Sequence, residues 1–181
     1  MRERRWTRDR WLEFGEARLK EAGPPALGLD ALCAAAGRTK GSFYHHFPRT
    51  EAFVDALVAR WRERTTDRIG EVALAARAHE TASRTLLKLV SQIDPRLDLA
   101  MRGLAGSRPE VARAIEAMDL RREEIVAHLL KAAYGLDDDR ARAASRLFHA
   151  VYLAAQLRAP DDIRAFTDPP YALLRDLLGQ A

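Results

Sequence analysis

Apolar residues recur at helical spacing along most of the chain. The first repeat predicts a helix over residues 7–22, whose inward face carries Trp11, Leu12, Gly15, Leu19 and Ala22. The Gly-Pro-Pro sequence at 23–25 ends this helix, because glycine and proline interrupt helical backbone. Two short helices are expected next, over 29–36 and 40–47, with a turn at Gly37 and a capping residue at Thr39 between them. Pro48 ends the second of these.

The remaining residues predict further helices. We expect a long one over 50–78, with Phe53, Leu57, Trp61, Ile69, Val72 and Ala76 facing inward. Helices over 81–93 and 96–104 follow, and Ser107 with Glu110 has the spacing of a capping box that opens another, closed by Gly135. An acidic cap at 137–139 opens a helix to about residue 158, and the last helix, after Pro160, is expected to break at 168–170 and resume over 171–178.

No segment has the alternating pattern of a strand, so the predicted fold class is all-α. A three-helix unit at 1–50 precedes a larger helical domain at 51–181. Within the first unit, the two short helices and their glycine turn form a helix-turn-helix pattern. Phe43 and Phe47 lie four residues apart and face inward, which leaves a short polar face suited to a DNA groove.

The net charge strengthens this interpretation. Residues 1–50 carry ten Lys/Arg and six Asp/Glu, whereas the remaining 131 residues carry twenty of each, so the whole surplus of +4 lies in the first unit. Such asymmetry favours an anionic partner, of which DNA is the commonest. Cys33 is the single cysteine, which excludes an intrachain disulfide and is expected to be an inert core thiol rather than a redox sensor. Without an apolar run long enough to span a membrane, the chain is expected to be cytoplasmic.

The run Leu-Cys-Ala-Ala-Ala-Gly-Arg-Thr-Lys-Gly-Ser-Phe-Tyr-His-His-Phe at 32–47 resembles the DNA-binding domain of the TetR/AcrR family of transcription regulators. The likeness extends over about residues 11–57, and the later residues match only in length and helix count. It implies a homodimer, usually a repressor, in which each subunit places its third helix in the major groove of a palindromic operator. It also implies that the larger domain pairs the subunits and binds a small-molecule effector.

The resemblance also implies which residues contact double-stranded DNA. These are Arg38, Thr39, Lys40, Gly41, Ser42, Tyr44, His45, His46 and Arg49. Thr39 would cap the helix and touch phosphate, Lys40 would reach a phosphate or a base edge, and Tyr44 would bind phosphate. Three positions depart from the family pattern: Arg38 replaces an apolar residue, Thr50 a phosphate-binding lysine and Gly28 a capping hydroxyl. Arg49 is included as a substitute for that lysine.

For the larger domain, the residues considered as effector ligands are Trp61, Met101, Met118, Tyr134, His149 and Tyr152, although plain core packing is an alternative for each. Helices over 139–158 and 161–178 are expected to pair two subunits as a four-helix bundle. No metal or other cofactor is predicted, because adjacent helical residues such as His45 and His46 point about 100° apart. The arginines at positions 2, 4, 5 and 8 form either a minor-groove arm or a solvated terminus.

Two other classes of function stay open. An enzyme is not expected, because the sequence contains no phosphate-binding glycine loop, no zinc-spaced histidines and no nucleophile elbow, but active sites also arise from scattered residues. A helix-turn-helix used only as a protein-interaction module is the other alternative. Its binding would be insensitive to salt, whereas binding through phosphate contacts weakens steeply as salt rises.

Overall fold

The computed structural model describes residues 6–75, 88, 90 and 92–179, and these contain helices and turns with no strand. This confirms the all-α fold class. The predicted helix over 81–93 falls largely outside the described residues, as do the arginines at positions 2, 4 and 5.

The N-terminal unit follows the sequence pattern closely. It contains α1 (Arg8–Ala22), a 3-10 turn (Pro24–Leu27), α2 (Leu29–Ala36) and α3 (Lys40–Tyr44). Thr7 caps α1 by accepting a hydrogen bond from the Arg10 backbone N–H at 3.2 Å. The third helix is shorter than expected: the His46 N–H donates to the carbonyl of Phe43, three residues back, so the chain tightens into a turn before Phe47.

The predicted long helix is present but is not uniform. It consists of α4 (Thr50–Arg62), a π-helical stretch (Glu63–Asp67) and α5 (Arg68–Leu74). A π turn holds more residues than an α turn, so the buried positions step from Trp61 to Thr66 before continuing at Ile69. The expected inward position of Val72 is therefore wrong, and this side chain is 46% exposed.

Two further helices follow one another closely in the chain. They are α7 (Pro95–Gly103), followed by a 3-10 turn (Leu104–Ser107), and α8 (Pro109–Tyr134), which ends at Gly135 with a φ of 66°. The predicted capping box is wrong, because Ser107 belongs to the 3-10 turn and Arg108 occupies the cap without a side-chain hydrogen bond. Pro109 begins α8, where a missing N–H removes no helical hydrogen bond.

The last two helices form an antiparallel pair. Asp137 caps α9 (Asp138–Arg158) by accepting from the Arg140 N–H at 2.8 Å, as the acidic run predicted. The final helix, α10 (Ile163–Gly179), continues through Pro169 and Pro170, so the expected interruption is wrong. An interior proline removes a backbone hydrogen bond and its ring crowds the carbonyl four residues back, which usually kinks or ends a helix. Here the helical backbone nevertheless continues past both prolines.

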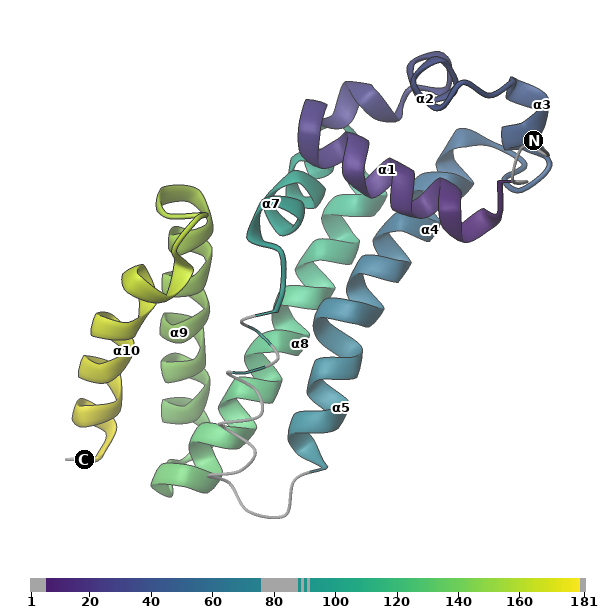
Figure 1. The fold of residues 1–181 in the computed structure, drawn as a ribbon. Coiled ribbons are helices and arrows are strands. Elements are labelled where there is room, and N and C mark those ends of the chain that lie inside the picture. Colours follow the sequence, from purple (N-terminus) through teal and green to yellow (C-terminus); the bar gives the residue numbers. More distant parts are fainter. Residues whose placement is uncertain (1–5, 76–87, 89, 91, 180–181) are drawn as a thin grey trace.

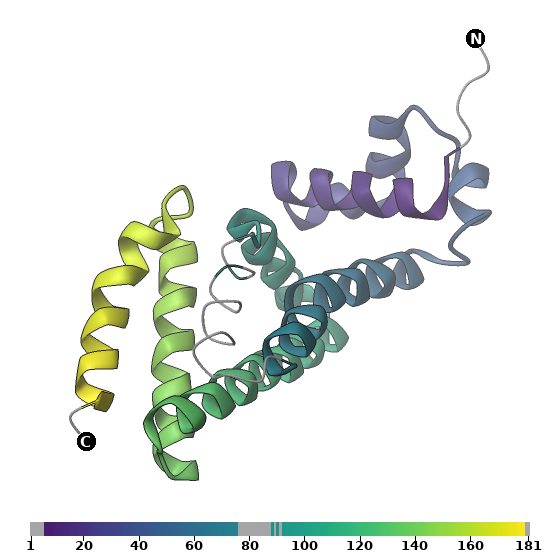
Figure 2. The same cartoon turned by 60° about the horizontal axis from the view of Figure 1, so that its bottom comes forward.

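The helices form an elongated molecule with the N-terminal unit at one end (Figures 1 and 2). The rod formed by α4 and α5 lies along α8 (Figure 1). On the other side of α8, α9 and α10 pack against each other. Helix α7 lies between α1 and the helical domain. One hydrophobic cluster extends from Trp11 and Phe43 through Trp61 to Met101 and Met118. The core of the first unit is therefore continuous with that of the larger domain across the expected boundary at residue 50.

Gly15 allows α1 and α4 to approach closely, because a Cβ there would lie 2.5 Å from Phe53 Cζ and 3.3 Å from Leu57 Cδ1. Gly15→Ala is expected to lower the free energy of unfolding by about 1–3 kcal/mol, as overpacking does. Gly41→Ala is the control, since the nearest atom to its added Cβ is Thr39 Oγ1 at 3.7 Å. Urea unfolding followed by circular dichroism measures both, and equal stability of the two variants would contradict the packing account.

Candidate nucleic-acid interface and helical-domain cavity

The turn between α2 and α3 is fixed by local hydrogen bonds. Gly37 adopts the left-handed conformation (φ 60°, ψ 36°), which glycine reaches without a steric penalty. The Arg38 N–H donates to the Cys33 carbonyl at 3.0 Å and thereby closes α2. Thr39 then caps α3 through its hydroxyl, which accepts from the Ser42 N–H at 3.2 Å. The predicted roles of Gly37 and Thr39 in the fold are confirmed.

An aromatic cluster holds α3 against the other helices. The fully buried Phe43 ring lies 5.4 Å, between ring centroids, from each of Trp11, Phe47 and Phe53, in edge-on or tilted arrangements. Such arrangements are favourable for aromatic pairs. Because Phe43 and Phe47 face inward, the side of α3 that faces solvent is polar.

The outer face of α3 and its flanks brings most of the predicted DNA contacts together. Exposed residues there are Thr39, Lys40, Gly41, Tyr44, His45 and Arg49, with Ser42 half-buried beside them. Tyr44 is 49% exposed although it is aromatic. The Lys40 ammonium pairs with Asp30 of α2 at 2.5 Å, with both side chains largely exposed, so this pair is weak and open to competition from another anion.

Arg38 and His46 are placed differently. Both are half-buried and turn toward Trp6: the Arg38 guanidinium lies 5.6 Å from the Trp6 ring centroid, and His46 Nε2 donates to the Trp6 carbonyl at 2.9 Å. Trp6 itself is buried against Trp11 and Phe14. We therefore interpret Arg38 and His46 as residues that anchor the N-terminal segment.

Comparison with known families bears directly on this unit. The family model for bacterial regulatory proteins of the tetR family matches residues 14–57, which contain α2, α3 and the start of α4. Residues 14–57 therefore form a helix-turn-helix domain of the tetR family. A search of curated proteins finds no match to this chain.

Solved structures extend the likeness of fold to the larger domain. A crystal structure described as a TetR/AcrR family transcriptional regulator has a TM-score of 0.68 at 19% identity, over 92% of this chain and 97% of the other. A transcriptional regulator from Cytophaga hutchinsonii has a TM-score of 0.62 at 16% identity, over 95% of this chain and 96% of the other. At these identities the comparison shows the fold. The chain therefore has the helix-turn-helix unit and larger helical domain of TetR-family regulators.

The larger helical domain contains a cavity of about 590 Å³ between α5, α8, α9 and α10. Tyr134, His149 and Tyr152, three of the residues expected to bind an effector, line it. The other three do not: Trp61, Met101 and Met118 are at most 1% exposed and belong to the hydrophobic cluster instead. Helical spacing marks inward-facing residues in general and does not separate the wall of a cavity from packed core.

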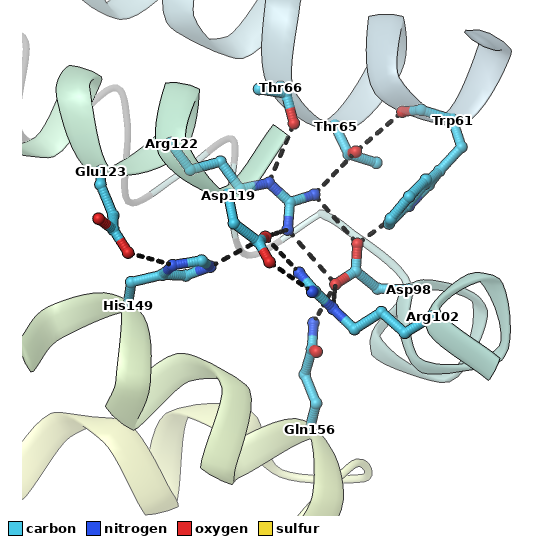
Figure 3. A network of polar contacts seen from close by, with 10 residues as sticks. All are labelled: Trp61, Thr65, Thr66, Asp98, Arg102, Asp119, Arg122, Glu123, His149 and Gln156. Atoms are coloured by element: carbon cyan, nitrogen blue, oxygen red, sulfur yellow. Dashed lines mark hydrogen bonds and ion pairs between the residues drawn. The ribbon is translucent and has the colours of Figure 1, made fainter. Parts of the chain in front are cut away.

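A buried carboxylate, Asp98 of α7, pairs with Arg122, which lines this cavity (Figure 3). Its Oδ1 accepts from Trp61 Nε1 at 2.9 Å and from Arg122 at 3.0 Å, and its Oδ2 accepts from Gln156 Nε2 at 2.6 Å. Burial by itself raises the pKa of Asp98, but the charge and hydrogen bonds of Arg122 and the amide of Gln156 outweigh it, so the pKa lies below its usual value. Asp98 is therefore ionised and joins α4, α7, α8 and α9.

Arg122 connects this carboxylate to the cavity wall. Its Nε donates to Thr66 Oγ1 at 3.0 Å, and its Nη2 donates to Thr65 Oγ1 at 3.0 Å as well as to Asp98. Both threonines belong to the π-helical stretch and, like Arg122, line the cavity. The guanidinium is therefore held on two sides and its charge is compensated inside the protein.

His149 lies at the edge of the same network. Its Nδ1 is 3.4 Å from Glu123 Oε1 and its Nε2 is 3.4 Å from Asp119 Oδ1 (Figure 3). Asp119 also receives two hydrogen bonds of 2.7 Å from Arg102. Burial lowers the pKa of His149 despite the two carboxylates, so the imidazole is neutral at neutral pH.

Within the part of the chain that the structure describes, no group of side chains is arranged to hold a metal ion, and no helix is long and apolar enough to cross a membrane.

The polar network was missed at the sequence level, although a signal was present. Arg122 occupies a position between Met118 and Ile125 in the apolar repeat of α8, and Asp98 lies beside Leu97 in an otherwise inward-facing stretch. Charged residues at core positions indicate a buried pair, because a lone charge there is costly. Which partners meet depends on four helices and is not visible from spacing.

The pairing of Asp98 with Arg122 is tested by a double-mutant cycle. Asp98→Asn removes the nearest carboxylate of the partly buried Arg122 and leaves it Asp119, at 4.0 Å, so the protein is expected to lose about 3 kcal/mol of stability. Arg122→Met should cost less in the Asp98→Asn background than in the wild type. Thermal unfolding gives the stability of the wild type, the two single variants and the double variant. Asp138→Asn is the control: it breaks the exposed pair with Lys131 and should change stability little. Additive losses would show that the two residues act independently.

Proposed function

We propose that the protein is a homodimeric transcriptional repressor that binds a palindromic operator through α3 and its flanks and releases it when a small molecule occupies the cavity. The observation that carries the DNA-binding part is the exposed polar face of α3, presented by the Thr39 cap and the buried Phe43. Repression as the sign of regulation comes from the family resemblance.

The proposed contact surface consists of Thr39, Lys40, Gly41, Ser42, Tyr44, His45 and Arg49. It combines two cations, Lys40 and Arg49, with several hydroxyl groups. Because Gly41 has no side chain, the backbone there can approach the bases closely. Phosphate contacts position such a helix, while side chains that reach base edges select the sequence. Asp30 shields Lys40 in the free protein, and a DNA phosphate would replace that carboxylate as its partner.

Dimerisation through α9 and α10 is supported by their outer surfaces. Large apolar side chains are exposed on both helices: Leu147 and Leu157 on α9, and Leu173 and Leu177 on α10, at 54–68% exposure. Exposed leucines grouped on two neighbouring helices favour a buried interface. A second copy related by a two-fold axis would cover them with the same two helices and form a four-helix bundle.

Two contact regions link the helical domain to the DNA-binding unit and provide a route for the effector response. On α4, Arg60 lies 3.4 Å from Glu16 of α1, and Arg64 of the π-helical stretch lies 3.2 Å from the same carboxylate. On the other side, Asp94, which caps α7, pairs with Lys20 of α1 at 2.7 Å. The Asp98 network fixes α7 to α4, α8 and α9, so a change at the cavity wall reaches α1 through both regions. Release requires that the effector bind the two arrangements with different affinity.

The DNA-binding proposal predicts that Lys40→Ala combined with Tyr44→Ala abolishes specific binding while the dimer stays folded. Two contacts are lost in each half-site, so affinity for a selected operator should fall at least about a hundredfold at constant salt. The dependence of affinity on salt should also become shallower, because fewer phosphates are neutralised. Fluorescence anisotropy with labelled duplexes measures both, and sedimentation checks the dimer.

Lys131→Ala is the matched control, since it removes one positive charge from the end of α8, away from the helix-turn-helix. It should leave operator affinity nearly unchanged. Full binding by the Lys40/Tyr44 variant would place the contact surface elsewhere. Binding to a protein partner that is strong and insensitive to salt, without DNA binding, would favour the interaction-module alternative.

A further inference from the structure

The walls of the cavity are mainly apolar. On α8 they are formed by Ile125, Val126, Leu129 and Leu130, and Ile69 of α5 faces them. A cavity of about 590 Å³ lies in the size range that accepts drug-sized molecules. Burying apolar surface of the ligand against these side chains would supply most of the binding free energy.

Charge inside the cavity is already neutralised by the protein. Arg122 is the least exposed cation of the described lining, with its side chain 11% exposed, and Asp98 lies 3.0 Å from it. All three nitrogens of its guanidinium already donate to Asp98, Thr65 or Thr66, so a ligand anion would have to compete with these partners. The other charged residues of the described lining, Lys88, Arg164, Asp168 and Arg175, are exposed, where water and salt screen them.

Aromatic rings of α9 and α10 also line the cavity. Phe148 and Tyr171 pack with ring centroids 4.9 Å apart, and the Tyr171 hydroxyl donates to the Phe148 backbone carbonyl at 2.9 Å, which fixes the Tyr171 ring against that of Phe148. Tyr152 and the neutral His149 line the cavity as well. Burial raises the pKa of Tyr152 to about 12, so its hydroxyl stays protonated and offers a hydrogen bond without a charge. Flat rings fixed in this way favour a flat ring as their partner.

From these features we infer that the cavity binds an uncharged, largely apolar molecule carrying an aromatic ring system, held between the aliphatic wall of α8 and the rings of α9 and α10. This inference rests on the proposed function, in which the cavity is the effector site, and adds the chemical class of the effector. The charged side chains Asp98 and Arg122 hold the cavity wall in place and do not recognise charge on the ligand.

A matched pair of fluorescent probes tests the preference for an uncharged molecule. N-phenylnaphthylamine is an uncharged aromatic amine, and anilinonaphthalenesulfonate is the same molecule with one sulfonate added. The uncharged probe should bind one site per chain at least about tenfold more tightly than the sulfonate, because an unpaired charge opposes entry into the cavity. Equal or tighter binding of the sulfonate would overturn the inference.

Variants of α8 locate the binding site. Ala133 lines the cavity, whereas Ala132, its neighbour in the chain, is exposed and does not line it. Ala133→Trp should weaken binding of the uncharged probe at least about tenfold, and Ala133→Leu, which fills less volume and disturbs the fold less, should weaken it by a smaller factor. Ala132→Trp is the control and should leave binding unchanged. Unweakened binding to either folded Ala133 variant would place the probe outside the cavity and overturn the inference.

Operator affinity is measured separately, with and without the uncharged probe. Binding of the probe that depends on Ala133 supports the inference whatever its effect on DNA. If that probe fills the cavity and DNA affinity does not change, the effector response of the proposed function fails while the chemical preference of the cavity stands.

Discussion

A carboxylate without any exposed surface has to obtain its counter-charge and its hydrogen-bond donors from the protein. Asp98 obtains them from Trp61, Arg122 and Gln156, which belong to α4, α8 and α9. This single requirement fixes α7 relative to three other helices. Since α7 also packs on α1, the position of the DNA-binding unit depends on the same carboxylate.

The arrangement connects two surfaces of different chemistry. At one end, the aromatic cluster around Phe43 holds α3 so that its outer face is polar and exposed. In the helical domain, Thr65, Thr66 and Arg122 belong both to the Asp98 network and to the cavity wall. A molecule in the cavity would therefore contact the residues that hold α7 and the π-helical stretch in place. In the proposed function, these shared residues would couple the cavity to the position of α1.

Local signals in the sequence predicted much of the fold. Gly37, Thr39 and Asp137 act through neighbours a few residues away, and their turn and capping roles are confirmed. The π-helical stretch was not predicted, because the sequence Glu-Arg-Thr-Thr-Asp has no feature that marks the slip from Trp61 to Thr66. The break expected at Pro169 and Pro170 was wrong: α10 continues past both, although an interior proline usually kinks or ends a helix.

The sites were predictable to different degrees. The exposed face of α3 is defined by nearby residues, because Phe43 and Phe47 mark the buried side of a short helix. Most residues of the exposed face could therefore be named from the sequence. Trp6 contacts both Arg38 and His46, the latter forty residues away in the sequence, and no local pattern reveals these contacts. Of the residues considered as effector ligands, Tyr134, His149 and Tyr152 line the cavity, whereas Trp61, Met101 and Met118 lie in the packed core, because the packing of four helices decides which inward side chains meet empty space.

The central claim is that two copies of α3 read a palindromic DNA sequence. Selection of bound duplexes from random DNA, carried out with the full-length protein at two salt concentrations, tests it most directly. The account predicts enrichment of an inverted repeat whose half-site centres lie about 34 Å apart or a multiple of that along the duplex, with weaker recovery at higher salt. Recovery of duplexes that share no motif at either salt concentration would contradict it.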